Sequence, residues 1–267
     1  MTAREQRLVF GEVAGAYDDV RAGYAAHVGE RIFTYVGGRV PVVEVGAGTG
    51  KATGMLLAAG AAVTCIEPDR RMAAVLRARF GDRVDLIDCG FEDWVPPPGG
   101  VPLICSAQAF HWVRPERRWR LAHDALTGGG TLALFGHGYG FVDAELEREI
   151  NAVYGRVAPE LLNPADGVEL APEQHWFHVE MAGSGLFTDI ASTLIESVVP
   201  YPTARYLTLL GTFSNHRMLP AARRERLHAG IAEVVDRRGA VVEVRLGTLL
   251  TMGRRTGCRR TNVGPDC

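Results

Sequence analysis

The sequence lacks the features that mark several classes of protein. Its five cysteines are scattered and none stands in a Cys-x-x-Cys pair, which predicts reduced structural thiols in place of disulfides or zinc ligands. No run approaches the roughly 20 apolar residues that cross a bilayer, and the first residues contain no apolar segment of the kind found in secretion signals. We therefore expect a cytoplasmic protein with no membrane partner.

An excess of charge is also missing. The 29 basic and 31 acidic residues give a formal net charge of -2, which provides no field for holding a polyanion, so we expect no nucleic-acid partner. At 267 residues, 47% hydrophobic and 22% charged, the chain fits one α/β domain with a cap. Residues 254–267 hold four arginines without periodicity. This segment could be a basic arm for RNA, but a disordered tail is the favoured interpretation.

Three alternate glycines follow a short apolar run and precede a helical pattern. The run Val42–Val45 has the β-branched composition of a buried strand. Gly46, Gly48 and Gly50 then let the backbone turn tightly and approach a ligand at the start of a helix. The sequence therefore predicts a cofactor-binding loop, the alternative being a merely tight turn between strand and helix.

The spacing of these glycines bears on which cofactor the loop holds. A dinucleotide loop has its third glycine three residues after the second, whereas here Lys51 stands in that place and Gly50 comes one residue early. Glu44, just before the glycines, would repel a phosphate but suits a ligand that carries an ammonium group and a sulfonium. A pyrophosphate site is thus disfavoured.

The stretch resembles the first motif of the class I S-adenosylmethionine-dependent methyltransferases, acid-x-Gly-x-Gly-x-Gly. The resemblance implies an α/β fold with a Rossmann-like, doubly wound sheet of seven strands, mostly parallel with one antiparallel strand, plus a helical cap. It also implies S-adenosylmethionine as the cofactor. The implied contacts in this stretch are Glu44, Gly46, Ala47, Gly48, Thr49 and Gly50.

An aromatic segment precedes the loop. Residues 8–36 carry apolar side chains at an approximate helical spacing, which predicts a segment that covers the cofactor. Its residues 17–24, Tyr-Asp-Asp-Val-Arg-Ala-Gly-Tyr, resemble the Tyr-Asp-x-x-Arg-Pro-x-Tyr segment of small-molecule methyltransferases, with Ala22 in place of proline. Tyr17 and Arg21 would then close over the methionine end of the cofactor, with Arg21 pairing with its carboxylate. Alternatively, Tyr17 is ordinary core and Arg21 a solvated charge.

The next strand and turn predict the ribose and adenine contacts. The strand Ala62–Ile66 ends at Glu67, about 20 residues after the glycine loop, where such folds bond a ribose. Pro68 follows it among the predicted cofactor contacts, and Asp69 caps a helix. Met72 either rests on the adenine or packs in the core of that helix.

A third strand, Val84–Asp88, leads into a turn with a more specific likeness. Residues 91–94 read Phe-Glu-Asp-Trp, which resembles the corresponding turn of the branch that includes the trans-aconitate methyltransferases. By that resemblance Phe91 and Glu92 contact the adenine ring. The alternative is that Phe91 and Trp94 only cover the edge of the sheet.

The fourth strand, Leu103–Ser106, ends in the stretch Ala-Gln-Ala-Phe-His-Trp over residues 107–112. The same branch has Ala-Gln-Ala-x-His-Trp here. If the first and fourth strands are neighbours, this stretch emerges beside the glycine loop at the switch point of the sheet. Ser106 and Gln108 are then cofactor contacts, Ser106 not being a nucleophile, and the acceptor pocket is lined by Phe110, His111 and Trp112. A lone histidine is otherwise more often structural.

His137 and Tyr139 follow the fifth predicted strand, Thr131–Phe135, at the same edge of the sheet. Methyl transfer from a sulfonium needs alignment and exclusion of water more than a catalytic triad. A carboxylate acceptor is already ionised, but a hydroxyl must lose a proton, which would suit His111 or His137 as a base. His137 could equally just pack there, and Tyr139 is predicted to face the substrate.

The order of elements predicts four segments. After residue 140 the alternation of strands and helices stops, and a helix-like run leads into a proline-rich loop that we interpret as a cap choosing the acceptor. His175 and His178 have a spacing found in metal sites, but no second cluster completes a coordination shell, so no metal is expected. The predicted segments are 1–140, a cofactor-binding core with an N-terminal lid; 141–187, the cap insertion; 188–253, the C-terminal part of the sheet and helices; and 254–267, the tail.

These observations support one main hypothesis and two alternatives. The main hypothesis is a methyltransferase that moves a methyl group from S-adenosylmethionine to a small-molecule acceptor, most simply to a carboxylate or hydroxyl oxygen, in a monomer or homodimer. The trans-aconitate resemblance favours a small carboxylate. The alternatives are a nicotinamide-dependent oxidoreductase, which the early third glycine disfavours, and a binding protein that holds the cofactor without turnover.

Overall fold

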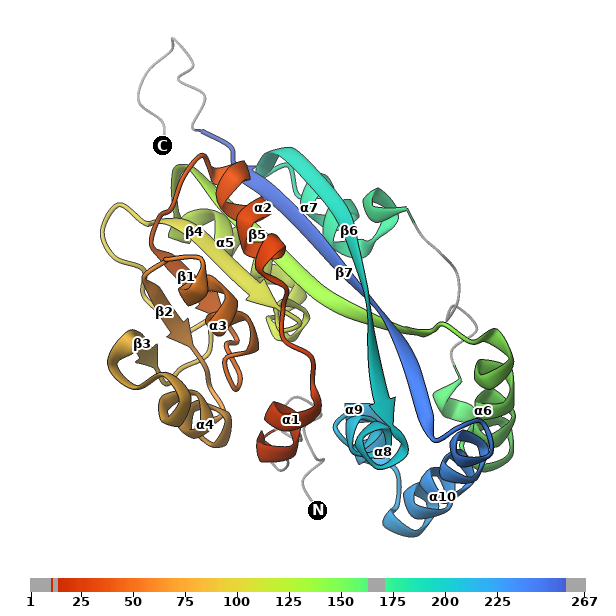
Figure 1. The fold of residues 1–267 in the computed structure, drawn as a ribbon. Coiled ribbons are helices and arrows are strands. Elements are labelled where there is room, and N and C mark those ends of the chain that lie inside the picture. The colour runs from red at the N-terminus through yellow and green to blue at the C-terminus, as the bar shows by residue number, and fades with distance from the viewer. Residues whose placement is uncertain (1–10, 12–13, 163–170, 258–267) are drawn as a thin grey trace.

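Seven strands form one sheet in the order β3-β2-β1-β4-β5-β7-β6 (Figure 1). The computed structural model describes residue 11 and residues 14–162 and 171–257. β7 is antiparallel to both its neighbours and the other pairs are parallel, which confirms the predicted fold class. The strands are β1 (Val42–Val45), β2 (Val63–Ile66), β3 (Val84–Ile87), β4 (Val101–Ala107), β5 (Leu126–Phe141), β6 (Phe187–Pro202) and β7 (Val241–Arg255).

Helices cover both faces of the sheet. They are α1 (Ala14–Val20), α2 (Ala26–Val36), α3 (Lys51–Ala58), α4 (Arg70–Phe80), α5 (Pro115–Ala125), α6 (Ala144–Val157), α7 (Trp176–Gly183), α8 (Thr203–Gly211), α9 (Ser214–Met218) and α10 (Ala221–Arg237). The approximate helical spacing over residues 8–36 extends across two helices, because residues 21–25 are not helical and separate α1 from α2. Gly23, a poor helix former, lies in this break. Phe10 and Val13 of that pattern lie outside the described residues.

Alternation along the strands divides the core between the two faces. Leu103 and Phe135 pack with α2 and α3 on one face, whereas Ile104 and Leu134 pack with α5 and α7 on the other. Neighbouring residues of one strand point to opposite faces, so a fully apolar strand serves both layers. β1 and β4 lie side by side, which places the switch point of the sheet at the end of the glycine loop.

Strands β5, β6 and β7 run far beyond the other four and carry a helical cap at their distant end (Figure 1). β5 extends over 126–141, so the predicted end of the fifth strand at Phe135 is wrong. Its continuation pairs with β7 from His137↔Thr248 to Phe141↔Val244. The alternate glycines after Phe135 read as a loop in the sequence, because the antiparallel partner that holds them extended lies about 110 residues away.

The cap combines helices from two of the predicted segments. Buried residues of α6, α8 and α10 pack together with Tyr201 of β6 and with Val242, Val244 and Leu246 of β7. α7, which the prediction placed with α6, instead packs through Phe177 and Met181 on the opposite face of the sheet. The predicted boundary at residue 254 is also wrong, because β7 continues through Arg255; residues 258–267 lie outside the described residues.

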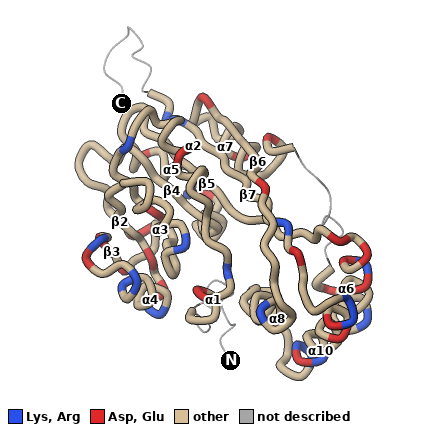
Figure 2. The backbone as a smooth tube through the Cα atoms, in the orientation of Figure 1, with Lys and Arg blue, Asp and Glu red and all other residues tan. Residues whose placement is uncertain are grey.

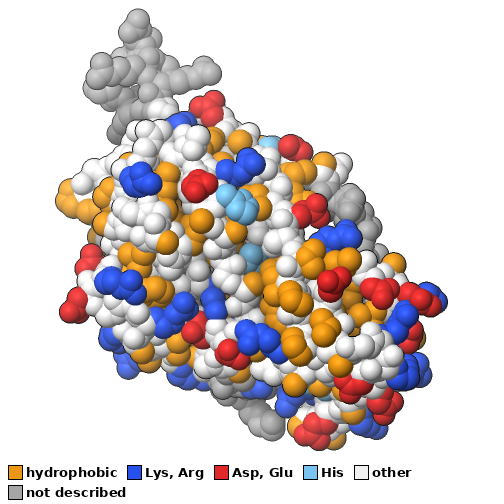
Figure 3. Space-filling model, in the orientation of Figure 1, with side chains coloured by type: hydrophobic (Ala, Val, Ile, Leu, Met, Phe, Trp, Pro, Cys, Tyr) orange, Lys and Arg blue, Asp and Glu red, His pale blue; other side chains and the backbone are white. Residues whose placement is uncertain are grey.

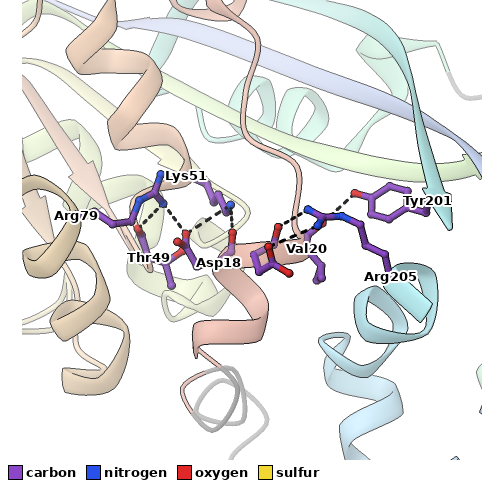
Figure 4. Close-up of polar contacts among 8 residues, drawn as sticks. Asp18, Val20, Thr49, Lys51, Arg79, Tyr201 and Arg205 are labelled. Carbon is purple, nitrogen blue, oxygen red and sulfur yellow. Dashed lines mark hydrogen bonds and ion pairs between the residues drawn. The ribbon is translucent and has the colours of Figure 1, made fainter. Parts of the chain in front are cut away.

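Helix α1 bridges the core and the cap (Figures 1 and 4). On the core side, Asp18 pairs with Arg79 of α4 at 2.5 Å and with Lys51 of α3 at 3.5 Å. On the cap side, Arg205 of α8 donates to the carbonyl of Asp19 at 2.6 Å, and the Tyr201 hydroxyl donates to the carbonyl of Val20 at 3.0 Å. α1 is therefore held from both sides.

Charges of both signs are interspersed along α6 and α10, whereas α4 carries arginines alone and the strands carry few charges (Figure 2). Figure 3 shows hydrophobic side chains gathered on the cap, and β6 adds the exposed Leu194 and Val198. Over the described ranges, no helix has both the length and the apolar character needed to cross a bilayer.

Candidate functional site

A cavity of about 320 Å³ opens where the strand ends of the core face the cap. A smaller hollow of about 40 Å³ adjoins it beside the glycine loop. Most of the predicted site residues line one or both spaces, among them Pro68, Met72, Phe91, Glu92, Trp112 and Tyr139 in the large cavity and Ala47 and Thr49 in the hollow. Residues shared by both are Tyr17, Arg21, Gly46, Gly48, Ala107 and Gln108.

The three glycines of the loop have different structural roles. Gly46 has φ +70°, and a Cβ there would lie 2.3 Å from the Cβ of Ala109. Gly48 has φ +58°, and the nearest atom to its Cβ position is the Met72 Cε at 3.5 Å, so this glycine leaves room within the cavity. A Cβ on Gly50 would strike the ring of Phe80 at 2.3 Å, so Gly50 serves helix packing. The predicted ligand contact of Gly50 is therefore not supported by its position.

Glu67 ties the two neighbouring loops together. The Gly48 N–H donates to Glu67 Oε2 at 2.7 Å, and the Asp69 N–H donates to Oε1 at 2.8 Å. Burial raises the pKa of Glu67, and the two backbone hydrogen bonds oppose that shift. A carboxylate has lone pairs beyond those two, so Glu67 can still accept from a ligand hydroxyl in the cavity.

Glu44 lines the hollow but is almost fully buried. The Thr53 hydroxyl donates to its Oε2 at 2.6 Å. Burial raises the pKa of Glu44 to about 8, so its carboxyl is largely protonated at neutral pH, contrary to the negative charge assumed from the sequence. An ammonium group placed in the hollow would lower that pKa and restore the charge.

Arg21 lies between the hollow and the cavity, and its side-chain hydrogen bonds are with residues far from it in the sequence. Its Nε donates to Thr212 Oγ1 at 2.8 Å and its Nη1 to the Tyr139 hydroxyl at 3.2 Å. The Phe213 ring lies 4.1 Å from the guanidinium carbon. Arg21 is only 8% exposed, so the alternative of a solvated charge is wrong.

Gln108 has an unusual backbone conformation at the sheet edge. Its φ is +53°, in the left-handed region that side chains other than glycine rarely adopt, and such positions cluster at functional sites. Its Nε2 donates to the carbonyl of His137 at 2.9 Å, which fixes the amide against β5.

His111 and Trp112 line the cavity with their rings 4.6 Å apart. Burial, with a smaller contribution from Arg118, lowers the pKa of His111 and favours its neutral form. Phe110 lies between them and the core: it is fully buried and packs on Trp119 at 5.2 Å. The predicted place of Phe110 in the acceptor pocket is therefore wrong.

Ser106 is likewise absent from both spaces. It is fully buried, and its hydroxyl donates to the carbonyl of Val45 at 2.8 Å, which joins β4 to the end of β1. Its predicted cofactor contact is wrong because the side chain is used inside the sheet.

His137 faces the cavity, but both of its ring nitrogens have partners. Nε2 donates to the carbonyl of Gly23 at 3.3 Å, which leaves Nδ1 to accept from Thr248 Oγ1 at 2.9 Å. Burial lowers its pKa to about 4. A base needs a free lone pair and a pKa nearer neutrality, so this geometry argues against His137 as the base.

Several residues that line the cavity were not predicted as site residues, among them Asp69, Phe213 and Ser214. Phe213 and Ser214 lie between α8 and α9, and no local motif marks them. Within the described residues, no group of three or more His, Cys, Asp or Glu could hold a metal ion. Nδ1 of His175 accepts from the Phe177 N–H and Nδ1 of His178 contacts Ser192.

Comparison with known proteins matches part of the chain to a family model. The sheet order and the glycine loop at the switch point define a Rossmann-like fold, and residues 42–130 match the family model of a methyltransferase domain. An uncharacterized methyltransferase of Mycobacterium bovis is 34% identical over 132 residues, 49% of this chain and 53% of that protein. The chain thus spans about half the length of the first curated relatives it matches.

Solved structures agree on the fold. A candidate type II methyltransferase from Anaeromyxobacter dehalogenans superposes with a TM-score of 0.65 at 19% identity, covering 89% of this chain and 99% of that one. Phosphoethanolamine N-methyltransferase 2 of Haemonchus contortus, in complex with phosphomonomethylethanolamine and S-adenosylhomocysteine, gives 0.51 at 13% identity, covering 92% and 57%. The domain match over residues 42–130, the relatives and the shared fold support the class I S-adenosylmethionine-dependent methyltransferase family that the motifs predicted. Its place in the trans-aconitate branch stays a prediction.

Proposed function

We propose that this chain transfers a methyl group from S-adenosylmethionine to an oxygen of a small-molecule acceptor. The observation that carries the proposal is the bond between the Gly48 N–H and Glu67, because it joins the tips of two parallel strands around a buried carboxylate at the cavity wall. Support also comes from the methyltransferase-domain match and from a structural neighbour that holds S-adenosylhomocysteine.

The residues present fit this cofactor. The open side of Gly48 leaves space where a larger residue would intrude, and Glu67 retains lone pairs for ribose hydroxyls. Met72 and Phe91 offer apolar surface in the same part of the cavity for an adenine ring. The methionine end would occupy the hollow beside Glu44, where the buried carboxyl can accept from an ammonium group.

When bound, the cofactor supplies an activated methyl group whose sulfur is a good leaving group. Trp112, Tyr139 and Phe213 then wall the acceptor side and exclude water. A ring nitrogen of His111 would take the proton from a hydroxyl acceptor, since its lowered pKa keeps it neutral. A carboxylate acceptor would need no such step.

Calorimetric titration with S-adenosylhomocysteine tests the cofactor site. We expect Gly48→Arg and Glu67→Ala each to weaken binding at least about tenfold, because one fills the cavity and the other removes the ribose acceptor. Gly140→Ala, whose Cβ would meet nothing within 4 Å, is the matched control. Unchanged binding in both site variants would refute the site.

Turnover separates this proposal from the two alternatives. Transfer of a labelled methyl group to any member of a metabolite panel excludes a protein that binds the cofactor without chemistry. The methyltransferase-domain match already disfavours a nicotinamide-dependent oxidoreductase, and a fluorescence change of NADH on mixing would reopen that alternative.

A further inference from the structure

Arg21 is a buried cation that reaches the cavity and has no acidic partner within the described part of the chain. Among the residues that the structure describes, the nearby acids Asp18 and Asp19 pair with other cations instead: Lys51, Arg79 and Arg205. Holding a guanidinium away from water is unfavourable unless an anion or several acceptors compensate. Arg21 is therefore prepared for an anionic ligand group.

Arg21 lines both the hollow and the cavity, and its side-chain hydrogen bonds are with residues at the cap end of the cavity. Thr212 and Phe213 follow α8, and Tyr139 lies on the extended part of β5. Phe213 and Tyr139 line the large cavity and not the hollow beside the glycine loop. The hydroxyls of Thr212 and Tyr139 take one hydrogen each from Nε and Nη1. The second hydrogen of Nη1 and both hydrogens of Nη2 can donate to a ligand.

The charges that line the cavity are segregated. Glu67, Asp69 and Glu92 follow β2 and β3, at the end proposed for adenosine. The lining residues described at the other end include Arg21 and the aromatic rings of Tyr139 and Phe213, and no acid. Complementarity then favours an acceptor with a negative group and a flat apolar body.

We propose that Arg21 recognises a carboxylate on a planar acceptor whose body lies against Phe213 and Tyr139. This inference rests on the proposed function, because it names the substrate class of the same site. It assigns Arg21 to the acceptor in place of the methionine carboxylate predicted from the sequence. The hollow for the methionine end is also lined by Lys51, at the N-terminus of α3, whose ammonium group pairs with Asp18.

The test compares acids with their neutral amides on the protein loaded with S-adenosylhomocysteine. Benzoate, cinnamate and fumarate are titrated by calorimetry beside their primary amides. We expect at least one acid to bind about tenfold more tightly than its amide, because a charge-assisted bidentate pair is lost in the amide. Arg21→Gln should remove this preference and Arg21→Lys should retain part of it. Arg237→Gln, which removes a cap cation that pairs with Glu149 outside the cavity lining, should leave it unchanged.

Two results would overturn the proposal while the proposed function stands. One is that every acid binds no better than its amide, or not at all up to about 10 mM, although S-adenosylhomocysteine binds. The other is that Arg21→Gln weakens S-adenosylhomocysteine about tenfold but leaves 5′-methylthioadenosine, which lacks the amino acid, unaffected. Failure of the wild-type protein to bind S-adenosylhomocysteine would instead refute the proposed function. The comparison of acid and amide uses the wild-type protein, so it holds even if a variant misfolds.

Discussion

The imidazole of His137 stacks on the ring of Tyr24, with 4.3 Å between centroids and 18° between planes. Tyr24 also meets Phe135 edge to face at 4.8 Å. The segment between α1 and α2 is thereby fixed to the middle of β5, beside the cavity. His137 acts in this arrangement as a packing and hydrogen-bonding residue.

This role predicts a pH dependence of stability. The pKa of His137 is lowered to about 4, below the ordinary value near 6.5, so between these values the unfolded chain binds the extra proton. The contribution of His137 to the free energy of unfolding is complete above pH 6.5. It is lost as the pH falls towards 4, and this loss is about 3 kcal/mol at most. In His137→Gln the free energy of unfolding should fall less over this window than in the wild type, as urea titrations at several pH values would show. An equal fall in both proteins would contradict the buried neutral imidazole.

His111 should affect turnover and not cofactor binding. If the acceptor is a hydroxyl, His111→Ala should lower kcat about 100-fold or more, because the neutral ring is the base, while the affinity for S-adenosylhomocysteine changes little. Activity in the wild type should be lost only below the ordinary histidine pKa, since the pKa of His111 is lowered. His123→Ala, a histidine of α5 paired with Asp124, is the control. Parallel loss of affinity and turnover would make His111 a structural or cofactor residue.

Gly46 should not tolerate a side chain. Gly46→Ala combines a positive φ with a contact of 2.3 Å to Ala109, so we expect a loss of about 1–3 kcal/mol in stability together with loss of cofactor binding. Adding Ala109→Gly should recover part of that loss by removing the contact. Gly54→Ala, within α3 and 3.5 Å from Phe80, should stabilise the protein by about 0.5–1 kcal/mol. Thermal unfolding of the four proteins would decide, and a stable Gly46→Ala would contradict the loop geometry.

The ion pairs of α1 should affect ligand affinity more than stability. Asp18→Asn removes the partner of Arg79 and Lys51, and we expect S-adenosylhomocysteine to bind severalfold more weakly because α1 carries Tyr17 of the cavity wall. The unfolding free energy should change by no more than about 1 kcal/mol, as is usual for partly exposed pairs. Asp19→Asn, which removes only the ion pair with Arg205 on the cap side and keeps the bonds to the carbonyls of Asp19 and Val20, is the comparison, and calorimetry at low and high salt is the measurement. Equal affinities in wild type and Asp18→Asn would show that the ion pairs of Asp18 do not contribute to ligand binding.

Much of the core was predictable because local signals and global fold agree there. Asp69 accepts from the Arg71 N–H as the predicted N-cap of α4, and Pro115 begins α5. The strand run Val42–Val45 is buried at every position. Such features depend on residues that are neighbours in the sequence, so they can be predicted from one amino-acid sequence.

The errors fall where distant segments decide the outcome. Phe110 stands in a motif beside His111, yet the turn that exposes His111 points Phe110 into the core. Ser106 ends a strand, but the carbonyl of Val45 takes its hydroxyl. The length of β5 depends on β7, and the surroundings of Arg21 on residues 212 and 213. No periodicity in the sequence carries that information.

The three long strands run through both the core and the cap, so their length sets the distance between the two. Thr248, at the midpoint of β7, contacts His137 of β5. On one side of β7, Val242 and Val244 pack in the cap, and Leu250 and Met252 pack in the core. A single inserted residue within β7 would turn one of these sets outward. Evolution or engineering can therefore exchange the helices between β6 and β7, and with them the chemistry accepted, but must leave the length of these strands unchanged.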